Sequence, residues 1–244
     1  MNFATLRPHR FLSRIRYLRE CLSHQQAVEE YLKDHEFFVQ CAAQREELRA
    51  AFRNRLQLQS LQVDEGTMLF PIELRLLQEL VERSNALPGP IIEVGTLFGY
   101  TTSRLALWKA ADKKVITVDN YSWNPWNVSS DVHQSLTRRF LHYLDASGQV
   151  EIRCMDKNDF FASYRGEPPA LVFIDADHSY EATKADIVWA HHIGAAIIAG
   201  HDYASHCPGV GRAVDDMGGA ARHAGGVWAL NTGYWKSQFQ RKAA

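Results

Sequence analysis

The sequence predicts an α/β fold: a mostly parallel sheet of seven strands that ends in an antiparallel hairpin, preceded by a helical extension. Two observations carry this prediction. From about residue 62 onward, short apolar runs alternate with segments whose apolar residues recur at helical spacing. One of these runs, residues 170–174, is apolar throughout, as expected of a central parallel strand buried on both faces.

The chain divides into an N-terminal helical extension, residues 1–61, and an α/β domain, residues 62–244. Residues 27–58 are rich in the helix formers Glu, Arg, Gln, Ala and Leu. A helix over 70–83 then has Pro71 near its start, where proline is tolerated. The expected strands are 91–94, 114–119, 150–154, 170–174, 195–199, 226–230 and 234–238, and the expected helices are 100–108, 131–144, 159–164, 180–192 and one that starts at 208. The last two strands flank Asn231-Thr-Gly233, which signals a hairpin turn.

The stretch of residues 90–106 has the pattern of a strand, a turn with two glycines and a helix. Ligands in open α/β sheets bind outside the carboxyl ends of the strands, where such a turn leaves the sheet. Gly95 lets the backbone approach a ligand closely because it has no Cβ. We expect the amides at the start of the helix to be unpaired and able to hold an anionic or polar group.

Asp119 ends the next predicted strand, 24 residues after Gly95. This is close to the roughly 20-residue spacing expected of a carboxylate that accepts hydrogen bonds from a ribose. Glu93 replaces the first glycine of the dinucleotide fingerprint, and a carboxylate beside a phosphate would repel it. The pattern therefore favours a cationic ligand with a ribose, although a plain βαβ corner without a ligand has a similar appearance.

The run E-V-G-T-L-F-G-Y-T-T resembles motif I of the class I S-adenosylmethionine-dependent methyltransferases, especially the catechol and caffeoyl-coenzyme A O-methyltransferases. The resemblance implies a Rossmann-like fold and S-adenosylmethionine as the cofactor. It also implies a hydrogen bond from the adenine amino group to a polar residue after the third strand, where Asp156 stands, although Asp156 could simply cap the following helix. The implied cofactor residues are Glu93, Gly95, Thr96, Gly99, Tyr100, Thr101, Asp119, Asn120, Asp156 and Asp175.

Two neighbouring strands end in residues that suit a divalent cation. Asp175 follows the strand at 170–174, and His201 and Asp202 follow the strand at 195–199. Neighbouring strands lie about 5 Å apart, so these side chains converge. Oxygen ligands favour magnesium or calcium, and an imidazole shifts the preference toward manganese, iron or zinc.

Three motifs, Ile-Asp-Ala-Asp-His-Ser-Tyr, Gly-His-Asp-Tyr and Pro-Gly-Val-Gly-Arg-Ala-Val-Asp, resemble the macrocin- and novobiocin-type sugar O-methyltransferases and the cephalosporin hydroxylase-like proteins over about residues 65–238. The resemblance implies a metal held by Asp175, His201 and Asp202, with His201 where those enzymes usually carry a carboxylate. It leaves two candidates for the base that takes the acceptor proton, His178 and Asp177. It also suggests that the N-terminal extension covers the acceptor site or pairs with a second subunit, whereas plain packing on the core is the alternative.

We therefore expect an O-methyltransferase that acts on a hydroxyl of a small molecule, a sugar or a phenolic natural product, with a divalent cation such as magnesium or manganese. The alternatives are a non-methylating, hydroxylase-like protein with the same fold and a nicotinamide-dependent oxidoreductase. The net charge of −1 and the lack of an apolar run of 18 residues imply no general affinity for nucleic acid or membrane. Four scattered cysteines favour a reducing cytoplasm. The basic first 19 residues suit a surface helix or a targeting segment, and we expect a cytoplasmic homo-oligomer, a dimer.

Overall fold

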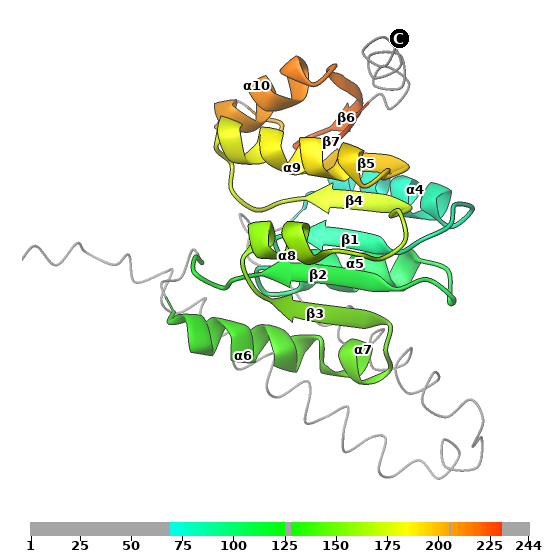
Figure 1. Cartoon of the computed structure of the whole chain (residues 1–244), viewed down its shortest axis with the longest axis vertical. Coiled ribbons are helices and arrows are strands. Elements are labelled where there is room, and N and C mark those ends of the chain that lie inside the picture. Colours follow the sequence, from blue (N-terminus) through cyan, green and yellow to red (C-terminus); the bar gives the residue numbers. More distant parts are fainter. Residues whose placement is uncertain (1–68, 125–127, 205, 231–244) are drawn as a thin grey trace, which may run out of the picture.

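A computed structural model describes residues 69–124, 128–204 and 206–230, which form an α/β domain (Figure 1). The strands of this described part are β1 (Ile91–Val94), β2 (Val115–Asp119), β3 (Val150–Cys154), β4 (Leu171–Ile174), β5 (Ile197–Gly200), β6 (Ala220–Ala224) and β7 (Val227–Leu230). Its helices are α4 (Pro71–Ser84), α5 (Tyr100–Trp108), α6 (Ser130–Phe140), α7 (His142–Ala146), α8 (Lys157–Ser163), α9 (Tyr180–His192) and α10 (Pro208–Asp216). None of these helices has the length and apolar character needed to cross a membrane.

The seven strands form one sheet in the order β3-β2-β1-β4-β5-β7-β6. The pairs β1–β2, β1–β4, β2–β3 and β4–β5 are parallel, whereas β7 is antiparallel to both β5 and β6. The predicted fold class, a mostly parallel seven-stranded sheet with a terminal antiparallel hairpin, is confirmed.

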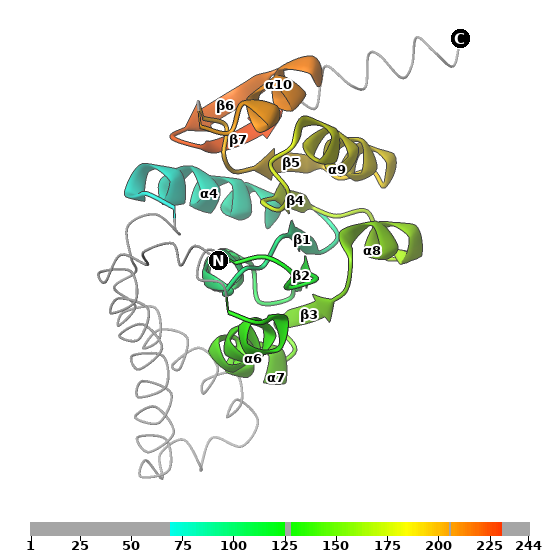
Figure 2. The ribbon, with the colours of Figure 1, turned by 90° about the vertical axis from the view of Figure 1, so that its left-hand side faces the viewer.

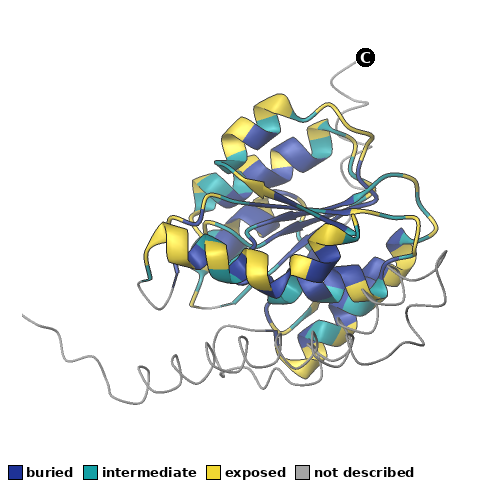
Figure 3. Ribbon diagram, turned by 90° about the horizontal axis from the view of Figure 1, so that it is seen from below, coloured by how far each residue is buried: buried dark blue, intermediate teal, exposed yellow. Residues whose placement is uncertain are grey.

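The helices cover the sheet on two faces, which gives three layers (Figure 2). Alternate residues of each strand point to opposite faces. In β1, Ile91 packs into one core cluster, with leucines of α4, α5 and α7, and Ile92 packs into a second cluster, with side chains of α8, α9 and α10. Figure 3 shows the strands buried between these helices, as the continuous apolar run of β4 predicts.

The hairpin is composed differently from the prediction. β7 was expected to pair across Asn231-Thr-Gly233, but in the structure it turns at Gly225 and pairs with β6, a strand that was not predicted. The sequence of β6, Ala-Ala-Arg-His-Ala, lacks apolar alternation because this edge strand is mostly exposed. The predicted strand at 234–238 and the predicted extension at 1–61 lie outside the described residues.

The helix predicted over 131–144 is two helices, α6 and α7, that meet at Leu141. Leu141 leaves the helical conformation with φ −89° and ψ 4°, and its side chain is fully buried. It lies against Gly99, where a Cβ would come within 2.8 Å of its Cγ. The break therefore places a core leucine beneath the turn that precedes α5.

Candidate active site

The carboxyl ends of β1, β4 and β5 meet at one edge of the sheet. In the register of the strands, Val94 lies beside Ile174 and Ile174 beside Gly200. The residues that follow these strand ends therefore lie side by side. The backbone of Gly95 touches Asp175 so closely that a Cβ at Gly95 would lie 2.0 Å from the Asp175 carbonyl oxygen.

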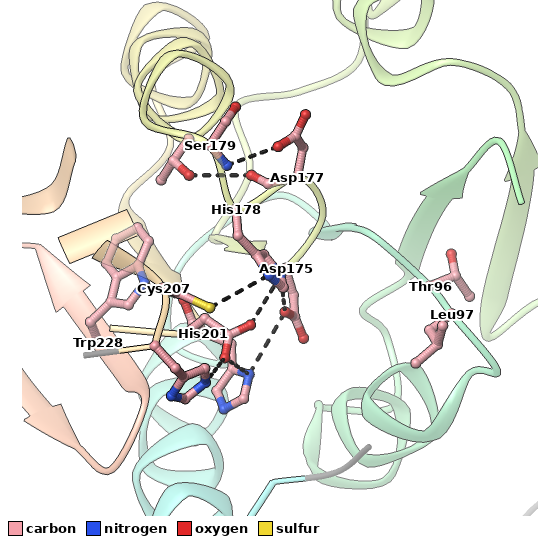
Figure 4. Close-up of polar contacts among 12 residues, drawn as sticks. Thr96, Leu97, Asp175, Asp177, His178, Ser179, His201, Cys207 and Trp228 are labelled. Carbon is pink, nitrogen blue, oxygen red and sulfur yellow. Dashed lines mark hydrogen bonds and ion pairs between the residues drawn. The ribbon is translucent and has the colours of Figure 1, made fainter. Parts of the chain in front are cut away.

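Four predicted site residues form one cluster at this edge, shown in Figure 4 with its ion pairs as dashed lines. The Nδ1 atom of His201 lies 3.7 Å from Oδ1 of Asp175 and 3.6 Å from Oδ1 of Asp202. The Nε2 atom of His178 lies 3.0 Å from Oδ2 of Asp202 and 3.9 Å from Oδ1 of Asp175. The structure thus brings the three predicted metal ligands together with one of the two predicted bases.

The charges in this cluster shift the pKa of each member. Burial would raise the pKa of Asp175, but the imidazoles of His178 and His201 close to its carboxylate lower it to about 2. The carboxylates of Asp175 and Asp202 raise the pKa of His178 to about 10. Burial opposes the charged form of His201, yet the two aspartates raise its pKa to about 9. In the absence of a cation, both imidazoles are therefore protonated at neutral pH and balance the carboxylates.

Local backbone features aim these side chains at one another. Asp202 has φ +61°, a left-handed conformation that is uncommon outside glycine, though aspartate tolerates it better than most residues. At Gly200 a Cβ would lie 2.5 Å from the Trp228 ring, whose Nε1 donates to the His201 carbonyl at 2.9 Å. At Gly209 a Cβ would lie 2.5 Å from the His178 carbonyl oxygen, so this glycine lets α10 pack against the segment that carries His178.

The donor atoms of Asp175, His201 and Asp202 fit a divalent cation. One such atom from each residue lies within 4.8 Å of the others. Separations of 3.6–3.7 Å between nitrogen and oxygen are too long for hydrogen bonds. They are close to the roughly 3.0–3.4 Å between two ligands that each lie about 2.1 Å from a common ion. His178, Asp202 and Cys207 form a second group that meets the same distance limit.

Glu73 of α4 belongs to this site and was not predicted from the sequence. Its Oε1 lies 3.4 Å from Nε2 of His201 and accepts the Gly226 amide at 2.6 Å, and its Oε2 accepts the Phe70 amide at 2.6 Å. Glu73 is the third residue of a helix, where glutamate commonly closes a capping box. That local signal marks a helix start and says nothing of a neighbour far away in the sequence.

The two predicted bases differ in position. His178 lies inside the cluster, whereas Asp177 points away from it (Figure 4). The Oδ1 atom of Asp177 accepts the Ser179 amide at 2.8 Å, and this hydrogen bond lowers the pKa of Asp177. Ser179 in turn caps α9 by accepting the Ala182 amide. Asp177 thus shapes the turn into α9, and the geometry favours His178 as the base.

Glu93 is fully buried under the glycine turn. Its Oε2 accepts the hydroxyls of Thr102 and Thr117, both at 2.5 Å, while Oε1 faces no hydrogen-bond partner among the described residues. Burial raises the pKa of Glu93 to about 8, against the two hydroxyls that lower it. Glu93 is therefore largely neutral at pH 7 without a ligand, which corrects the expectation of a standing negative charge. A cation bound nearby would favour its ionised form, so the residue fits a sulfonium or ammonium ligand.

Asp119 closes the turn that it was expected to face. Its Oδ2 accepts the amides of Thr96 and Leu97, each at 2.9 Å, and its Oδ1 accepts the Tyr121 amide at 2.7 Å. The amides of Thr96 and Leu97 are therefore paired, whereas the expectation of unpaired amides concerned the start of α5 at Tyr100. Each carboxylate oxygen can accept more than one hydrogen bond, so Asp119 can still receive ribose hydroxyls.

The other predicted cofactor residues lie around this turn or beside it. Gly99 precedes α5 with φ +85°, where its lack of a Cβ avoids strain. Tyr100 and Thr101 open α5, and the Tyr100 hydroxyl accepts Arg104 at 2.9 Å. Asn120 accepts the Ser122 amide at 3.0 Å in the loop after β2. Asp156 accepts the Asn158 amide at 2.8 Å and caps α8, which is the alternative to an adenine contact that the sequence left open.

Comparisons with known proteins place this geometry in context. Residues 92–203 match a family model described as a methyltransferase domain. The search of curated proteins found no match.

Several solved structures share the fold. An O-methyltransferase from Bacillus cereus, in complex with SAH, is 20% identical with a TM-score of 0.53 and covers 74% of this chain and 87% of its own. TomG from Streptomyces achromogenes, an O-methyltransferase of tomaymycin synthesis in complex with SAM, is 15% identical with a TM-score of 0.51, over 74% and 86%. CalS11, a TDP-rhamnose 3′-O-methyltransferase of calicheamicin biosynthesis, is 17% identical with a TM-score of 0.52, over 77% and 95%. These structures confirm the predicted fold.

Proposed function

We propose that the protein is an S-adenosylmethionine-dependent O-methyltransferase that methylates a hydroxyl of a small molecule with the help of a divalent cation, since residues 92–203 match a model of a methyltransferase domain and the fold is shared with O-methyltransferases. One observation carries this proposal. Asp175, His178, His201 and Asp202 converge beside the Gly95 turn, so a cluster suited to bind and deprotonate a hydroxyl adjoins the expected cofactor site.

The cofactor side of the proposal rests on the β1–α5 turn. The missing Cβ of Gly95 lets the turn pack against the backbone of Asp175, and Asp119 would accept hydrogen bonds from the ribose of the adenosyl ligand. Glu93 is a buried acid beneath this turn, and a bound sulfonium or ammonium would favour its ionised form. The cofactor supplies a methyl group on a sulfonium, and the acceptor oxygen takes this methyl while the sulfur keeps the bonding electrons. Because the turn and the cluster adjoin, they would hold the two reactants close together, which would lower the entropic part of the barrier.

The acceptor side of the proposal rests on Asp175, His201 and Asp202, which would hold the cation through two carboxylate oxygens and Nδ1. The chemistry that a divalent cation would supply at this position is a lower pKa of the acceptor hydroxyl. Mixed oxygen and nitrogen ligands suit manganese, iron or zinc as well as magnesium.

His178 is the proposed base, and its Nε2 takes the acceptor proton. The pKa of about 10 in the cation-free cluster would keep this ring protonated and unable to act. The cause of that raised pKa is the pair of carboxylates of Asp175 and Asp202 beside the ring. A cation that engages both carboxylates removes much of this cause, so the base and the metal are expected to act together.

The acceptor class follows from the relatives by analogy. CalS11 is a TDP-rhamnose 3′-O-methyltransferase, so a sugar hydroxyl is the acceptor to be tested first, and the phenol expected from the sequence is the second. A cytoplasmic homodimer, expected from the sequence, stays a prediction that sedimentation and fractionation would test.

The proposed function is tested by methyl transfer from labelled S-adenosylmethionine to a panel of nucleotide sugars and catechols. Asp175→Ala and Asp202→Ala should abolish turnover while adenosyl binding persists, and His178→Ala should lower turnover by about 10²–10⁴-fold. Glu79→Gln on α4 is the matched control: it alters an exposed ion pair with Arg222 of β6 and should keep full activity. Full turnover after exhaustive chelation would refute the role of the metal.

A further inference from the structure

We propose that Glu73 is a positioning residue for the candidate metal site: its carboxylate holds the His201 ring so that Nδ1 faces Asp175 and Asp202. This inference rests on the proposed function, because it assigns a partner to one of the proposed metal ligands. It concerns a residue on α4, outside the segment 92–203 that matches the methyltransferase family.

The contacts of Glu73 point to more than a local role. The side chain is 3% exposed, and three donors converge on its two oxygens. Oε2 accepts the Phe70 amide at the start of its own helix. Oε1 accepts the Gly226 amide from the turn between β6 and β7 and lies 3.4 Å from Nε2 of His201. Glu73 therefore joins α4, the edge hairpin and the end of β5 at one point.

The chemistry of these atoms assigns the ring nitrogens of His201. An ionised carboxylate only accepts hydrogen bonds, so once a cation takes the lone pair of Nδ1, the hydrogen of the neutral ring must be on the nitrogen that faces Glu73. That nitrogen is Nε2. The remaining Nδ1 lies 3.6–3.7 Å from an oxygen of each aspartate, and its lone pair is the only part of a neutral ring that can bind a cation there. Histidine ligands of metals commonly donate their second N–H to a carboxylate in this way, which sets both tautomer and orientation.

The backbone around the pair leaves space for it and for little else. A Cβ at Gly225 would lie 2.5 Å from Oε1 of Glu73, and a Cβ at Gly226 would lie 3.0 Å from Nε2 of His201. On its other side, His201 is held through its carbonyl, which accepts Nε1–H of Trp228 at 2.9 Å. Glu73 thus holds the ring of His201 and Trp228 holds its backbone, and the two contacts together determine the direction of the ring.

A purely structural role for Glu73 is the competing explanation, because it also closes the capping box of α4. The chain offers a variant that separates the two roles. Phe70 has φ −67°, which proline adopts without strain, and its side chain is exposed. Phe70→Pro removes the amide that Oε2 accepts but leaves Oε1 facing His201. Glu79→Gln on the same helix controls for loss of a carboxylate at the surface.

The test compares Mn²⁺ affinity by titration calorimetry in the full-length wild type, Glu73→Gln, Phe70→Pro and Glu79→Gln. Loss of a carboxylate partner typically lowers metal affinity by about 10–100-fold. We expect this loss in Glu73→Gln and a change of less than about twofold in the other two variants. Wild-type affinity in Glu73→Gln, or an equal loss in Phe70→Pro, would overturn the inference.

A second readout keeps the inference testable if no variant binds a cation. Crystal structures of the cation-free wild type, Phe70→Pro and Glu73→Gln give the direction of the His201 ring. We expect Nδ1 to face Asp175 and Asp202 in the wild type and in Phe70→Pro, and a ring turned away from this direction in Glu73→Gln. Absence of Mn²⁺ binding by the wild type, together with this crystallographic result, would reject the metal-assisted function and retain the role of Glu73 in orienting the ring, whereas an unchanged ring direction in Glu73→Gln would reject that role itself.

Discussion

Glu93→Gln tests the electrostatics beneath the cofactor turn. Burial raises the pKa of Glu93 from 4.5 to about 8, so the folded protein retains a proton that the unfolded chain releases near pH 4.5. The stability that this proton contributes is fully present below pH 4.5 and is lost as the pH rises through 8. At 1.36 kcal/mol per pH unit, the loss reaches up to about 5 kcal/mol at pH 8.

Glutamine cannot ionise, so the variant avoids this loss. Its amide oxygen can accept the hydroxyls of Thr102 and Thr117, and its NH₂ group takes the place of the protonated Oε1. We expect Glu93→Gln to match the wild type within about 1 kcal/mol at pH 4.5 and to be more stable by about 2–5 kcal/mol at pH 8.

Urea unfolding of the ligand-free protein, followed by circular dichroism from pH 4.5 to 8.5, measures this difference. Other groups titrate in the same range, including His191, whose pKa burial lowers to about 4. They contribute equally to both proteins and cancel in the comparison. A stability difference that stays constant with pH, or a variant less stable than the wild type at pH 8, would refute the reasoning.

Three further predictions follow from single contacts. Asp119→Ala leaves three backbone amides without their acceptor, so unfolding experiments should show lower stability. Calorimetry should show adenosyl binding weakened by about 1–3 kcal/mol, and unchanged binding would contradict the ribose role of Asp119. Lys157→Met leaves the buried carboxylate of Asp186 unpaired, so urea unfolding at pH 8 should show a free energy of unfolding lower by about 3–5 kcal/mol. The loss should be smaller at pH 5, because burial raises the pKa of Asp186 to about 6 and protonation removes its charge. Equal losses at both pH values would contradict this explanation. Gly225→Ala and Gly148→Ala both place alanine at positive φ, but only the Cβ at residue 225 meets a neighbouring atom within 4 Å, namely Oε1 of Glu73. Only Gly225→Ala should therefore also weaken Mn²⁺ binding in calorimetry. Equal binding by the two variants would contradict the packing argument.

Much of the fold could be predicted because the local signals are strong. β1, α5 and α9 begin and end at the predicted residues, since each is bounded by glycine, proline or a capping residue. The strand β6 could not be predicted, because an exposed edge strand needs no apolar alternation and owes its structure to pairing with β7.

The candidate site could be predicted only where its residues follow strand ends. Asp175, His201 and Asp202 converge because the register of β4 and β5 is that of a regular parallel pair. Glu73 reaches the same point from a helix far away in the sequence, and only the packing of α4 against β6 and β7 brings it there. The roles of His178 and Asp177 were open because adjacent residues in a turn can point in opposite directions, which no spacing rule determines.

Crystals soaked with Mn²⁺ and S-adenosylhomocysteine, with data collected at the manganese absorption edge, test the central claim most directly. The account predicts one anomalous peak at the carboxyl ends of β4 and β5, about 2.0–2.3 Å from oxygens of Asp175 and Asp202 and from Nδ1 of His201. It also predicts adenosyl density along the Gly95 turn. Adenosyl density without a manganese peak, with His201 still paired to the two aspartates, would contradict the metal-assisted mechanism.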